Sequence, residues 1–417
     1  MSRARNIPSA RAWALVLFAV ALAIRAGFLW LHPEYTDGFM SIRGVPYSDA
    51  RDWNGMAKST ATGHGVDSTY PGMRALYPIF LAHFYTWFGD SLPLAKALQA
   101  LIGAASTALV FLTLRRAMVH WAALAAALFF AADPRQVTQA GKLMTEPFGL
   151  LLILLSAWCL VIGGERRRPG MLFASGAFFA CANLARPLTL FALPLFVALV
   201  ALNARHWRTA AIHVAAFVLG TMICLGPWVV RERIVHGIWG ISCNSAEALF
   251  AASSPEFGTW TTAVKAVPEK AGIPRKVKER YDFFQSRFRE NLRNYPGFYA
   301  ENVVRSLGGA ALSGENFSAA FRRWTAAIAV IGIVFTLWWR LFPGAVLVVC
   351  HFGSLLGSAL FGNPDLQRMR LLIDWLEVGW VFAGLAAVEI AATTLPTAAK
   401  PANTQPTSSQ SISSRIR

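Results

Sequence analysis

Ten runs of mainly apolar residues constrain this chain more than any other feature. A helix needs roughly 20 apolar residues to cross the hydrocarbon core of a bilayer. The runs lie at residues 13–31, 93–114, 120–133, 146–163, 171–185, 188–203, 210–230, 324–339, 342–361 and 371–392. Charged residues make up only 15% of the chain, against about 25% in soluble domains. The sequence therefore predicts an all-α, polytopic membrane protein of about ten transmembrane helices.

The first run follows a basic N-terminus, as in a secretory signal peptide. It is longer than the apolar region of a typical signal peptide and lacks a clear cleavage site. We therefore expect a retained first transmembrane helix.

The turns between the runs predict how the chain crosses the membrane. With the N-terminus inside, the cytoplasmic turns are Arg115–Arg116, Glu165–Arg168, Arg205–Arg208 and Arg340, and each is basic. Cytoplasmic turns carry such an excess of Lys and Arg. We therefore expect both termini in the cytoplasm and the longer loops on the extracytoplasmic side of the membrane. The net charge of +17 fits these turns and contacts with anionic membrane lipids, and no nucleic-acid partner is expected.

Two long polar segments divide the chain into units. The first outside loop (32–92) and a later segment (231–323) mix charged and aromatic residues. We expect amphipathic helices in the first loop and a helical extracytoplasmic segment in the second, because 275–292 has helical propensity. The predicted units are an N-terminal transmembrane module (1–230), the extracytoplasmic segment (231–323), C-terminal transmembrane helices (324–392) and a disordered cytoplasmic tail (393–417).

Acidic residues open a predicted helix in the first outside loop. Ser48 is a candidate N-cap, and Asp49 in the first turn would stabilise the helix by interacting with its dipole. Asp49, Asp52 and Trp53 share one helix face by their spacing. A carboxylate there could equally act as a general base at the membrane surface. The spacing leaves both interpretations open.

The corner before the fourth run carries charges that capping alone does not explain. Thr145 is the expected N-cap, with Pro147 in the first turn. Lys142 and Glu146 lie beside the mouth of an apolar helix, where charges are costly and more often functional. Capping and function therefore both stay open for Glu146.

Four arginines stand at predicted outside ends of the apolar runs: Arg186, Arg231, Arg368 and Arg370. Snorkelling to the interface is the simplest explanation for a single such arginine. Trp228, near one of them, is typical of an interfacial anchor. As a group, the arginines are candidates to converge on an anion, because a guanidinium fork suits phosphate.

A series of different short motifs occurs along most of the chain. They are Ser48-Asp49-Ala50 with Trp53, Tyr70-Pro71-Gly72, Leu76–Ala82, Leu98–Ala104, Thr145-Glu146-Pro147, Leu184-Ala185-Arg186-Pro187, Pro227-Trp228 with Arg231, Ile241-Ser242 with Asn244, and Arg368-Met369-Arg370. This order resembles the GT-C superfamily of membrane glycosyltransferases, in the bacterial branch near glycosyltransferase family 39. Protein O-mannosyltransferases and the aminoarabinose transferase of lipid A belong there.

The resemblance implies a GT-C-like fold for the N-terminal module and a polyprenyl-phosphate-linked sugar as donor. It also implies inverting transfer, to a lipid, glycan or protein acceptor, with Asp49 as the catalytic base in the first loop. Asp49 is followed by Ala50, whereas both named branches carry Glu at that position, so no sugar is assigned. Arg51 and Arg74 are candidates for a further phosphate-binding cation. A divalent metal is possible in the superfamily and could be shared by Asp49, Asp52 and Glu146. No dedicated ligand set is apparent, so no metal or other cofactor is predicted.

Two other functions are compatible with these residues. A transporter or flippase of a lipid-linked or anionic solute would place charges in mid-membrane helices. Asp374 and Glu377 in the last run are the main residues in its favour. A ligase that transfers a whole lipid-linked glycan would use the same donor chemistry. The charges cluster at the outside ends, which favours an enzyme.

Overall fold

The computed structural model describes residues 9–32, 48–67, 72–187, 189–256, 276–312, 319–361 and 374–394. Within these ranges every regular element is a helix. Each of the ten predicted spans coincides with an apolar helix, six of them long enough to cross a membrane alone and four shorter. They are α1 (Ala10–Leu31), α4 (Leu92–Ala117), α5 (His120–Ala132), α7 (Thr145–Arg166), α8 (Pro169–Ala185), η3 with α9 (Leu190–Ala192, Leu193–Leu202), α10 (Trp207–His236), α15 (Ala319–Trp339), α16 (Leu341–Leu360) and α18 (Asp374–Thr394). The all-α polytopic prediction is confirmed.

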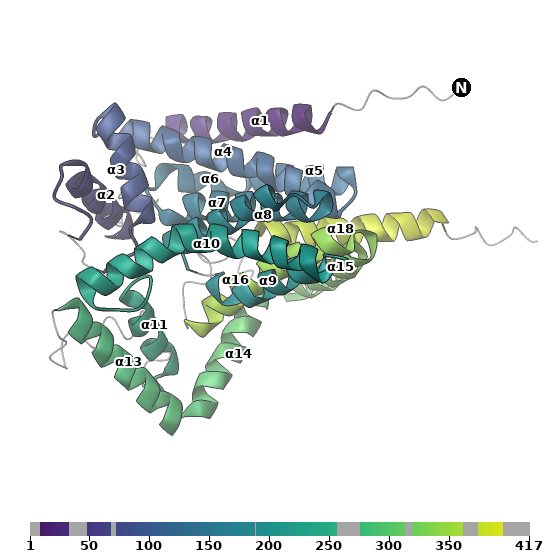
Figure 1. Cartoon of the computed structure of the whole chain (residues 1–417). Coiled ribbons are helices and arrows are strands. Elements are labelled where there is room, and N and C mark those ends of the chain that lie inside the picture. The colour runs from purple at the N-terminus through teal and green to yellow at the C-terminus, as the bar shows by residue number, and fades with distance from the viewer. Residues whose placement is uncertain are drawn as a thin grey trace, which may run out of the picture.

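The remaining helices gather mainly at one end of the bundle (Figure 1). The first loop forms α2 (Ser48–Ala61) and α3 (Leu76–Phe88), and the later segment forms α11 (Asn244–Ser253), α13 (Val277–Asn294) and α14 (Pro296–Leu312). A short connection, α6 (Pro134–Thr138) with η2 (Gln139–Gly141), leads into α7. The expected helices in both polar segments are therefore present. Only the first two residues of the predicted tail, 393 and 394, lie among the described residues, at the end of α18.

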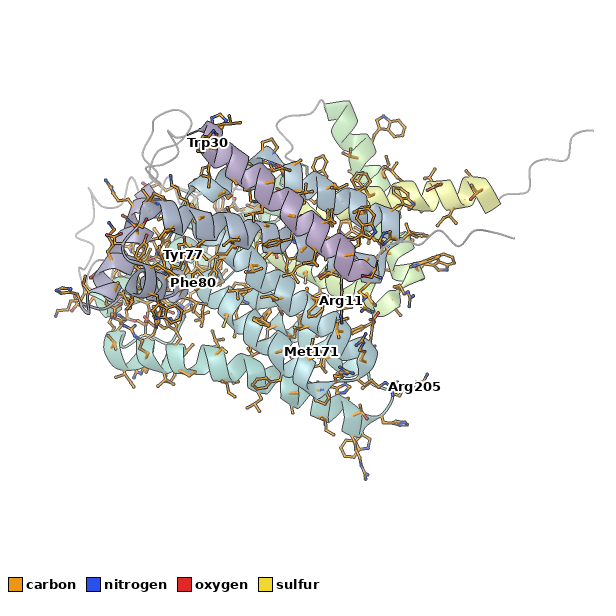
Figure 2. The ribbon with its side chains drawn as sticks, turned by 90° about the horizontal axis from the view of Figure 1, so that it is seen from above. Arg11, Trp30, Tyr77, Phe80, Met171 and Arg205 are labelled. Atoms are coloured by element: carbon orange, nitrogen blue, oxygen red, sulfur yellow. The ribbon has the colours of Figure 1, made fainter. Side chains whose placement is uncertain are left out.

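The bundle has two chemically different ends. In Figure 2, Arg11, Met171 and Arg205 lie at one end, and Trp30, Tyr77 and Phe80 lie at the other. The beginning of α1 and the end of α18 lie at the first of these ends, opposite α2 and α3 (Figure 1). The alternation of basic turns and long loops that the sequence predicts is thus reproduced in the arrangement of the helices.

The first-loop helices pack on each other and on the bundle. Trp53 and Met56 of α2 are buried against Leu81 of α3. The Tyr85 hydroxyl donates a 2.6 Å hydrogen bond to Asn54 Oδ1 across the same contact. Phe80 stacks on Phe148 of α7 with ring centroids 4.5 Å apart. This apolar contact holds α2, and the acidic residues on it, at the end of the transmembrane bundle.

The seventh transmembrane helix extends further than the sequence predicts. We expected it to end at residue 230, but α10 continues to His236 with Pro227 inside it. The last turns are stabilised by Asp67 of the first loop, which pairs with Arg231 and whose Oδ1 lies 3.2 Å from His236 Nε2. Polar residues there can stay helical because their charges are paired outside the apolar run. The helix end is therefore joined to the first loop.

The cap of α7 also differs from the prediction. The N-cap is Met144, and Thr145 is already the first helical residue. The Thr145 hydroxyl donates to Glu146 Oε2 over 3.2 Å and accepts from Arg186 Nη1 over 3.3 Å. Thr145 therefore does not cap its own helix, because its hydroxyl joins a buried ion pair.

Glycines allow α8 and α10 to approach closely. A Cβ atom on Gly176 would overlap the Phe217 carbonyl oxygen, and one on Gly220 would overlap the Phe173 carbonyl oxygen. Small residues at transmembrane interfaces let backbones come into contact in this way. Because α8 ends beside Arg186 and α10 carries Arg231, this contact sets the relative position of two candidate site residues.

We predict that Gly220→Ala destabilises the protein by about 1–3 kcal/mol, because the added methyl group has no space at the α8–α10 contact. Thermal unfolding of the purified protein in detergent measures the effect as a lower Tm. Gly226→Ala in the same helix is the matched control, because a Cβ there meets no atom within 4 Å. Equal Tm values for the two variants would contradict the packing argument.

A second prediction concerns Asp67 and pH. Burial opposes ionisation of Asp67, but the hydrogen bonds and charges of Arg231 and His236 outweigh it and hold its pKa below the ordinary value of 3.8. The ionised Asp67 therefore stabilises the folded protein above that pH, and this stabilisation is lost as the pH falls through the lowered pKa. The Tm difference between wild type and Asp67→Asn should be larger at about pH 5 than at about pH 3.

The control for this prediction is the Lys58–Asp90 pair, which is about half exposed and has an N–O distance of 2.7 Å. An exposed pair of this kind contributes about 0–1 kcal/mol, so Asp90→Asn should change Tm little at either pH. A Tm difference for Asp67→Asn that is the same at both pH values would show that the Asp67 charge does not stabilise the loop.

Candidate active site

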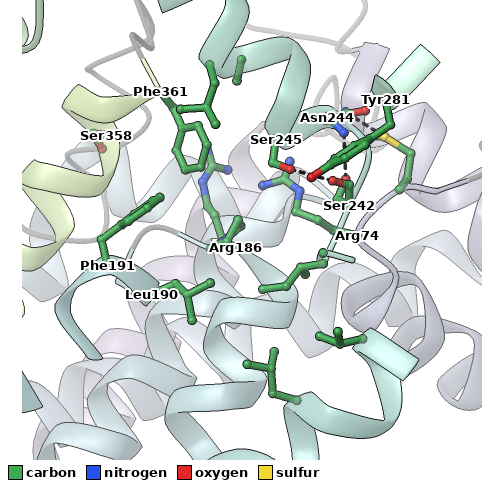
Figure 3. A pocket seen from close by; sticks show the side chains of 18 of the residues that line it. Arg74, Arg186, Leu190, Phe191, Ser242, Asn244, Ser245, Tyr281, Ser358 and Phe361 are labelled. Carbon is green, nitrogen blue, oxygen red and sulfur yellow. Dashed lines mark hydrogen bonds between the residues drawn. The ribbon is translucent and has the colours of Figure 1, made fainter. Parts of the chain in front are cut away.

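A cavity of about 580 Å³ lies where the first loop, the end of α8, α10 and the later polar segment meet. Its lining residues are Asp49, Asp52, Trp53, Met73, Arg74, Arg186, Pro187, Leu190, Phe191, Leu225, Val229, Trp239, Gly240, Ile241, Ser242, Asn244, Ser245, Ala248, Leu249, Tyr281, Ser358 and Phe361. Figure 3 shows many of these side chains around the cavity. The volume falls within the roughly 300–1,000 Å³ that is typical of small-molecule sites.

Two of the three predicted acidic residues line this cavity. Asp49 and Asp52 lie on α2, together with the buried Trp53, as the predicted shared helix face requires. Glu146 is not a lining residue; it lies behind the cavity wall and is 1% exposed. The cavity therefore receives two carboxylates from one helix, and the third acidic residue acts on it only through another side chain.

That side chain is Arg186, which caps the end of α8. Arg186 Nη1 lies 2.7 Å from Glu146 Oε1, and both side chains are at most 4% exposed. A buried charge without a partner is strongly destabilising, so the ion pair explains why both charged residues are present. The simplest sequence interpretation of Arg186, a snorkelling side chain at the interface, is wrong. Arg186 is buried and also reaches the cavity.

Arg74 supplies a second cation to the cavity. Its guanidinium carbon lies 5.8 Å from the centre of the Trp53 ring, a cation–π contact that connects the loop before α3 to α2. The alternative candidate, Arg51, lies on the exposed side of α2 and is not among the lining residues. Of the two arginines that the sequence left open, the structure brings Arg74 to the carboxylates.

The other predicted cations lie apart from the cavity or outside the described residues. Arg231 stacks on Trp228 at 4.7 Å and pairs with Asp67 and Glu232. Lys142 is half-buried and is not a lining residue. Arg368 and Arg370 lie outside the residues that the structure describes. Of the predicted cations, Arg186 and Arg74 line the cavity, and their convergence on an anion stays a prediction.

The later polar segment contributes a wall of the cavity that the sequence indicates only in part. Ser242 and Asn244 belong to one of the ordered motifs, but Ser245 and Tyr281 carry no motif signal. The turn before α11 is held by hydrogen bonds from Cys243 N to Gly72 O and from Trp228 Nε1 to Ile241 O, each 2.9 Å long. Tyr281 lies on α13, far along the chain from the lining residues between 49 and 74, and only the fold brings them to one cavity.

The described residues contain no group of three or more His, Cys, Asp or Glu side chains that could hold a metal ion. Asp49 and Asp52 are two carboxylates, and Glu146 is bonded to Arg186 instead of facing them. The three acidic residues that the superfamily resemblance suggested for a shared metal therefore do not form one ligand set.

Comparisons with known proteins agree with the fold. Residues 75–230 match the family model of dolichyl-phosphate-mannose-protein mannosyltransferases. The structure is similar to the oligosaccharyltransferase AglB from Archaeoglobus fulgidus, solved with an inhibitory peptide and a dolichol-phosphate, with 13% identity, a TM-score of 0.57, and coverage of 91% of this chain and 51% of that one. A second structure of the A. fulgidus oligosaccharyltransferase, with zinc and sulfate, gives a TM-score of 0.51 at 13% identity, over 91% and 49% of the two chains.

The chain thus spans about half the length of the archaeal enzyme. ArnT from Cupriavidus metallidurans, bound to undecaprenyl phosphate, is 16% identical over 92% of this chain and 79% of that one, but its TM-score of 0.41 is too low to compare folds. Among curated protein sequences, none matches the chain.

At 13% identity the archaeal structures share only their fold with this chain. The fold and the family model nevertheless point to the same superfamily, and the ordered motifs point there independently. The chain is therefore a multi-pass helical membrane protein whose fold is similar to that of the archaeal oligosaccharyltransferase, and whose residues 75–230 resemble the family of dolichyl-phosphate-mannose-protein mannosyltransferases.

Proposed function

We propose that the protein transfers a sugar from a polyprenyl-phosphate donor to an acceptor hydroxyl on the extracytoplasmic face of a bacterial inner membrane. The observation that carries the proposal is one cavity lined by both Asp49 and Asp52 and by Arg74 and Arg186. Basic turns at the opposite end of the bundle support cytoplasmic termini and an outward-facing cavity in the cell envelope. The acceptor is a lipid, a glycan or a protein that presents a hydroxyl group.

Asp49 is the proposed general base. It accepts the proton of the acceptor hydroxyl as the oxygen attacks the anomeric carbon from the side opposite the phosphate. The carbon–oxygen bond to the phosphate breaks, polyprenyl phosphate leaves, and the anomeric configuration is inverted. Because a phosphate is a good leaving group, a single carboxylate suffices, with no separate acid.

Arg74 and Arg186 are the proposed phosphate-binding residues. The donor phosphodiester carries one negative charge, and the departing phosphate monoester gains another, so fixed cations stabilise the transition state more than the bound donor. The apolar residues on the flank of the cavity, among them Leu190, Leu225 and Val229, lie next to the transmembrane helices. They fit the isoprenoid part of such a donor.

The cavity volume favours transfer of one sugar over transfer of a whole glycan. About 580 Å³ suits a sugar phosphate and an acceptor group. The transport alternative has less support, because Asp374 is 3% exposed and its carboxylate lies 3.1 Å from Arg135. A residue that pairs in this way at the start of α18 has a structural reason for its charge.

We predict that Asp49→Asn lowers the transfer rate by about 10²–10⁴-fold, because the amide cannot accept the acceptor proton. The assay incubates the purified protein in liposomes with radiolabelled undecaprenyl-phosphate sugars and an envelope extract as acceptor. Asp52→Asn is the matched control on the same helix and should retain most of the rate. Full activity in Asp49→Asn, with loss in Asp52→Asn, would move the base to Asp52.

Arg74→Gln should lower the transfer rate by about 10²-fold, because it removes a cation that stabilises the negative charge developing on the departing phosphate. Arg51→Gln removes the same charge from the exposed side of α2 and should leave the rate within about twofold. Thermal unfolding of both variants checks that the first loop stays folded. Equal rates for the two variants would exclude Arg74 from the phosphate site.

A further inference from the structure

The wall of the cavity formed by the turn before α11, by α11 and by α13 carries no charge. Its lining residues are Trp239, Gly240, Ile241, Ser242, Asn244, Ser245, Ala248, Leu249 and Tyr281. The charged lining residues Asp49, Asp52, Arg74 and Arg186 come from α2, the loop before α3 and the C-cap of α8. The cavity therefore has a charged side and a neutral, hydrogen-bonding side.

The neutral wall is held in place before any ligand binds. Asn244 Nδ2 lies 2.9 Å from Met73 Sδ, and the Ser245 hydroxyl donates to the Ser242 carbonyl oxygen over 2.8 Å. The nearest acidic residue on α11, Glu247, is bonded to Arg280 Nη2 at 2.9 Å and is not a lining residue. A fixed set of polar groups selects a ligand more sharply than a mobile set, because less order is lost on binding.

Tyr281 presents a hydroxyl group to the cavity from this wall. In Figure 3 its phenol points toward Ser245, between the turn before α11 and Arg74. Its ring packs beside the small cluster of Ala246 and Phe284, and none of the hydrogen bonds found among the described residues uses its hydroxyl. Burial raises the pKa of Tyr281 above 10, so the phenol stays a neutral donor at physiological pH.

We propose that the wall formed by Ser242–Ser245 and Tyr281 binds the hydroxyl groups of an uncharged donor sugar, with Tyr281 as a specificity-determining residue. This assignment rests on the proposed sugar transfer. Neutral hydroxyl and amide groups match the hydroxyls of a neutral sugar one for one. The ammonium of an amino sugar or the carboxylate of a uronic acid would lose water there without gaining an opposite charge.

The test pairs a change in the protein with a change in the sugar. The donors are undecaprenyl-phosphate mannose and glucose, the monodeoxy analogues of the better one, an amino-pentose and a uronic acid. Wild type should transfer a neutral sugar and reject both charged sugars by at least about tenfold. In wild type, a deoxy donor should have a lower kcat/KM than the full donor. For one deoxy analogue this difference should disappear in Tyr281→Phe, because that variant already lacks the same hydrogen bond.

Tyr281→Phe keeps the ring and its packing, so the expected loss with the full donor is about three- to tenfold in kcat/KM, the value of one hydrogen bond. Tyr295→Phe is the matched control, because Tyr295 is exposed, lies between α13 and α14 and does not line the cavity. It should behave as wild type with every donor. Ser245→Ala, which keeps α11 helical, tests the same wall from the second element.

Three results would overturn the assignment. If the loss in kcat/KM from Tyr281→Phe and the loss from the deoxy donor add for every analogue, Tyr281 contacts no sugar hydroxyl. An equal loss with all donors, together with weaker binding of sugar-free undecaprenyl phosphate, would place the Tyr281 hydroxyl on the phosphate. Preferred transfer of a charged sugar would contradict the neutral wall. No transfer from any donor by wild type would instead overturn the proposed function itself.

Discussion

The buried ion pair between Glu146 and Arg186 is the interaction on which the rest of the site depends. It joins the first turn of α7 to the C-cap residue of α8, 40 positions further along the chain, and both side chains are almost without solvent. Breaking such a pair costs about 3–5 kcal/mol, because it leaves one charge buried alone. The backbone before α7 is fixed as well, since Gln99 Nε2 donates to the carbonyl oxygens of Lys142 and Met144. Two transmembrane helices therefore end at a defined place, with a guanidinium at the cavity.

Pairing also decides which cations can meet an anionic ligand. The charge of Arg231 is offset by Asp67 and Glu232, and this pairing holds the first loop against α10. Arg74 lies over the Trp53 ring in a cation–π contact and lines the cavity. Among the described residues, Arg231 thus pairs where it fixes the fold, whereas Arg74 and Arg186 line the cavity and Arg186 also holds the buried ion pair.

The transmembrane fold could be predicted because one strong rule applies to each span. An apolar run of about 20 residues must form a helix in a bilayer, since its backbone has no other hydrogen-bond partners. The helix ends obey weaker rules. Thr145 follows the pattern of an N-cap and Trp228 that of a terminal anchor, yet tertiary partners placed the first inside α7 and carried α10 on to His236.

The candidate site was predictable to a smaller extent. The i, i+3, i+4 spacing placed Asp49, Asp52 and Trp53 on one face of α2, which local geometry alone decides. The partner of Glu146, the choice of Arg74 over Arg51 and the position of Tyr281 depend on contacts between segments that are far apart in the sequence. No local pattern encodes such contacts, and the ordered motifs supplied only some of the residues concerned.

The family match covers only part of the cavity lining, which limits what the match can reveal about a substrate. The matched region, 75–230, supplies helices α3 to α10 and the buried ion pair. The carboxylates and Arg74 lie before it, and the neutral wall that contains Tyr281 lies after it. The matched region thus supplies much of the scaffold and Arg186, one of the two arginines that line the cavity. For the proposed sugar transfer, the carboxylates and the neutral wall lie outside the match, so the choice of sugar and acceptor has to be inferred from the walls of the cavity.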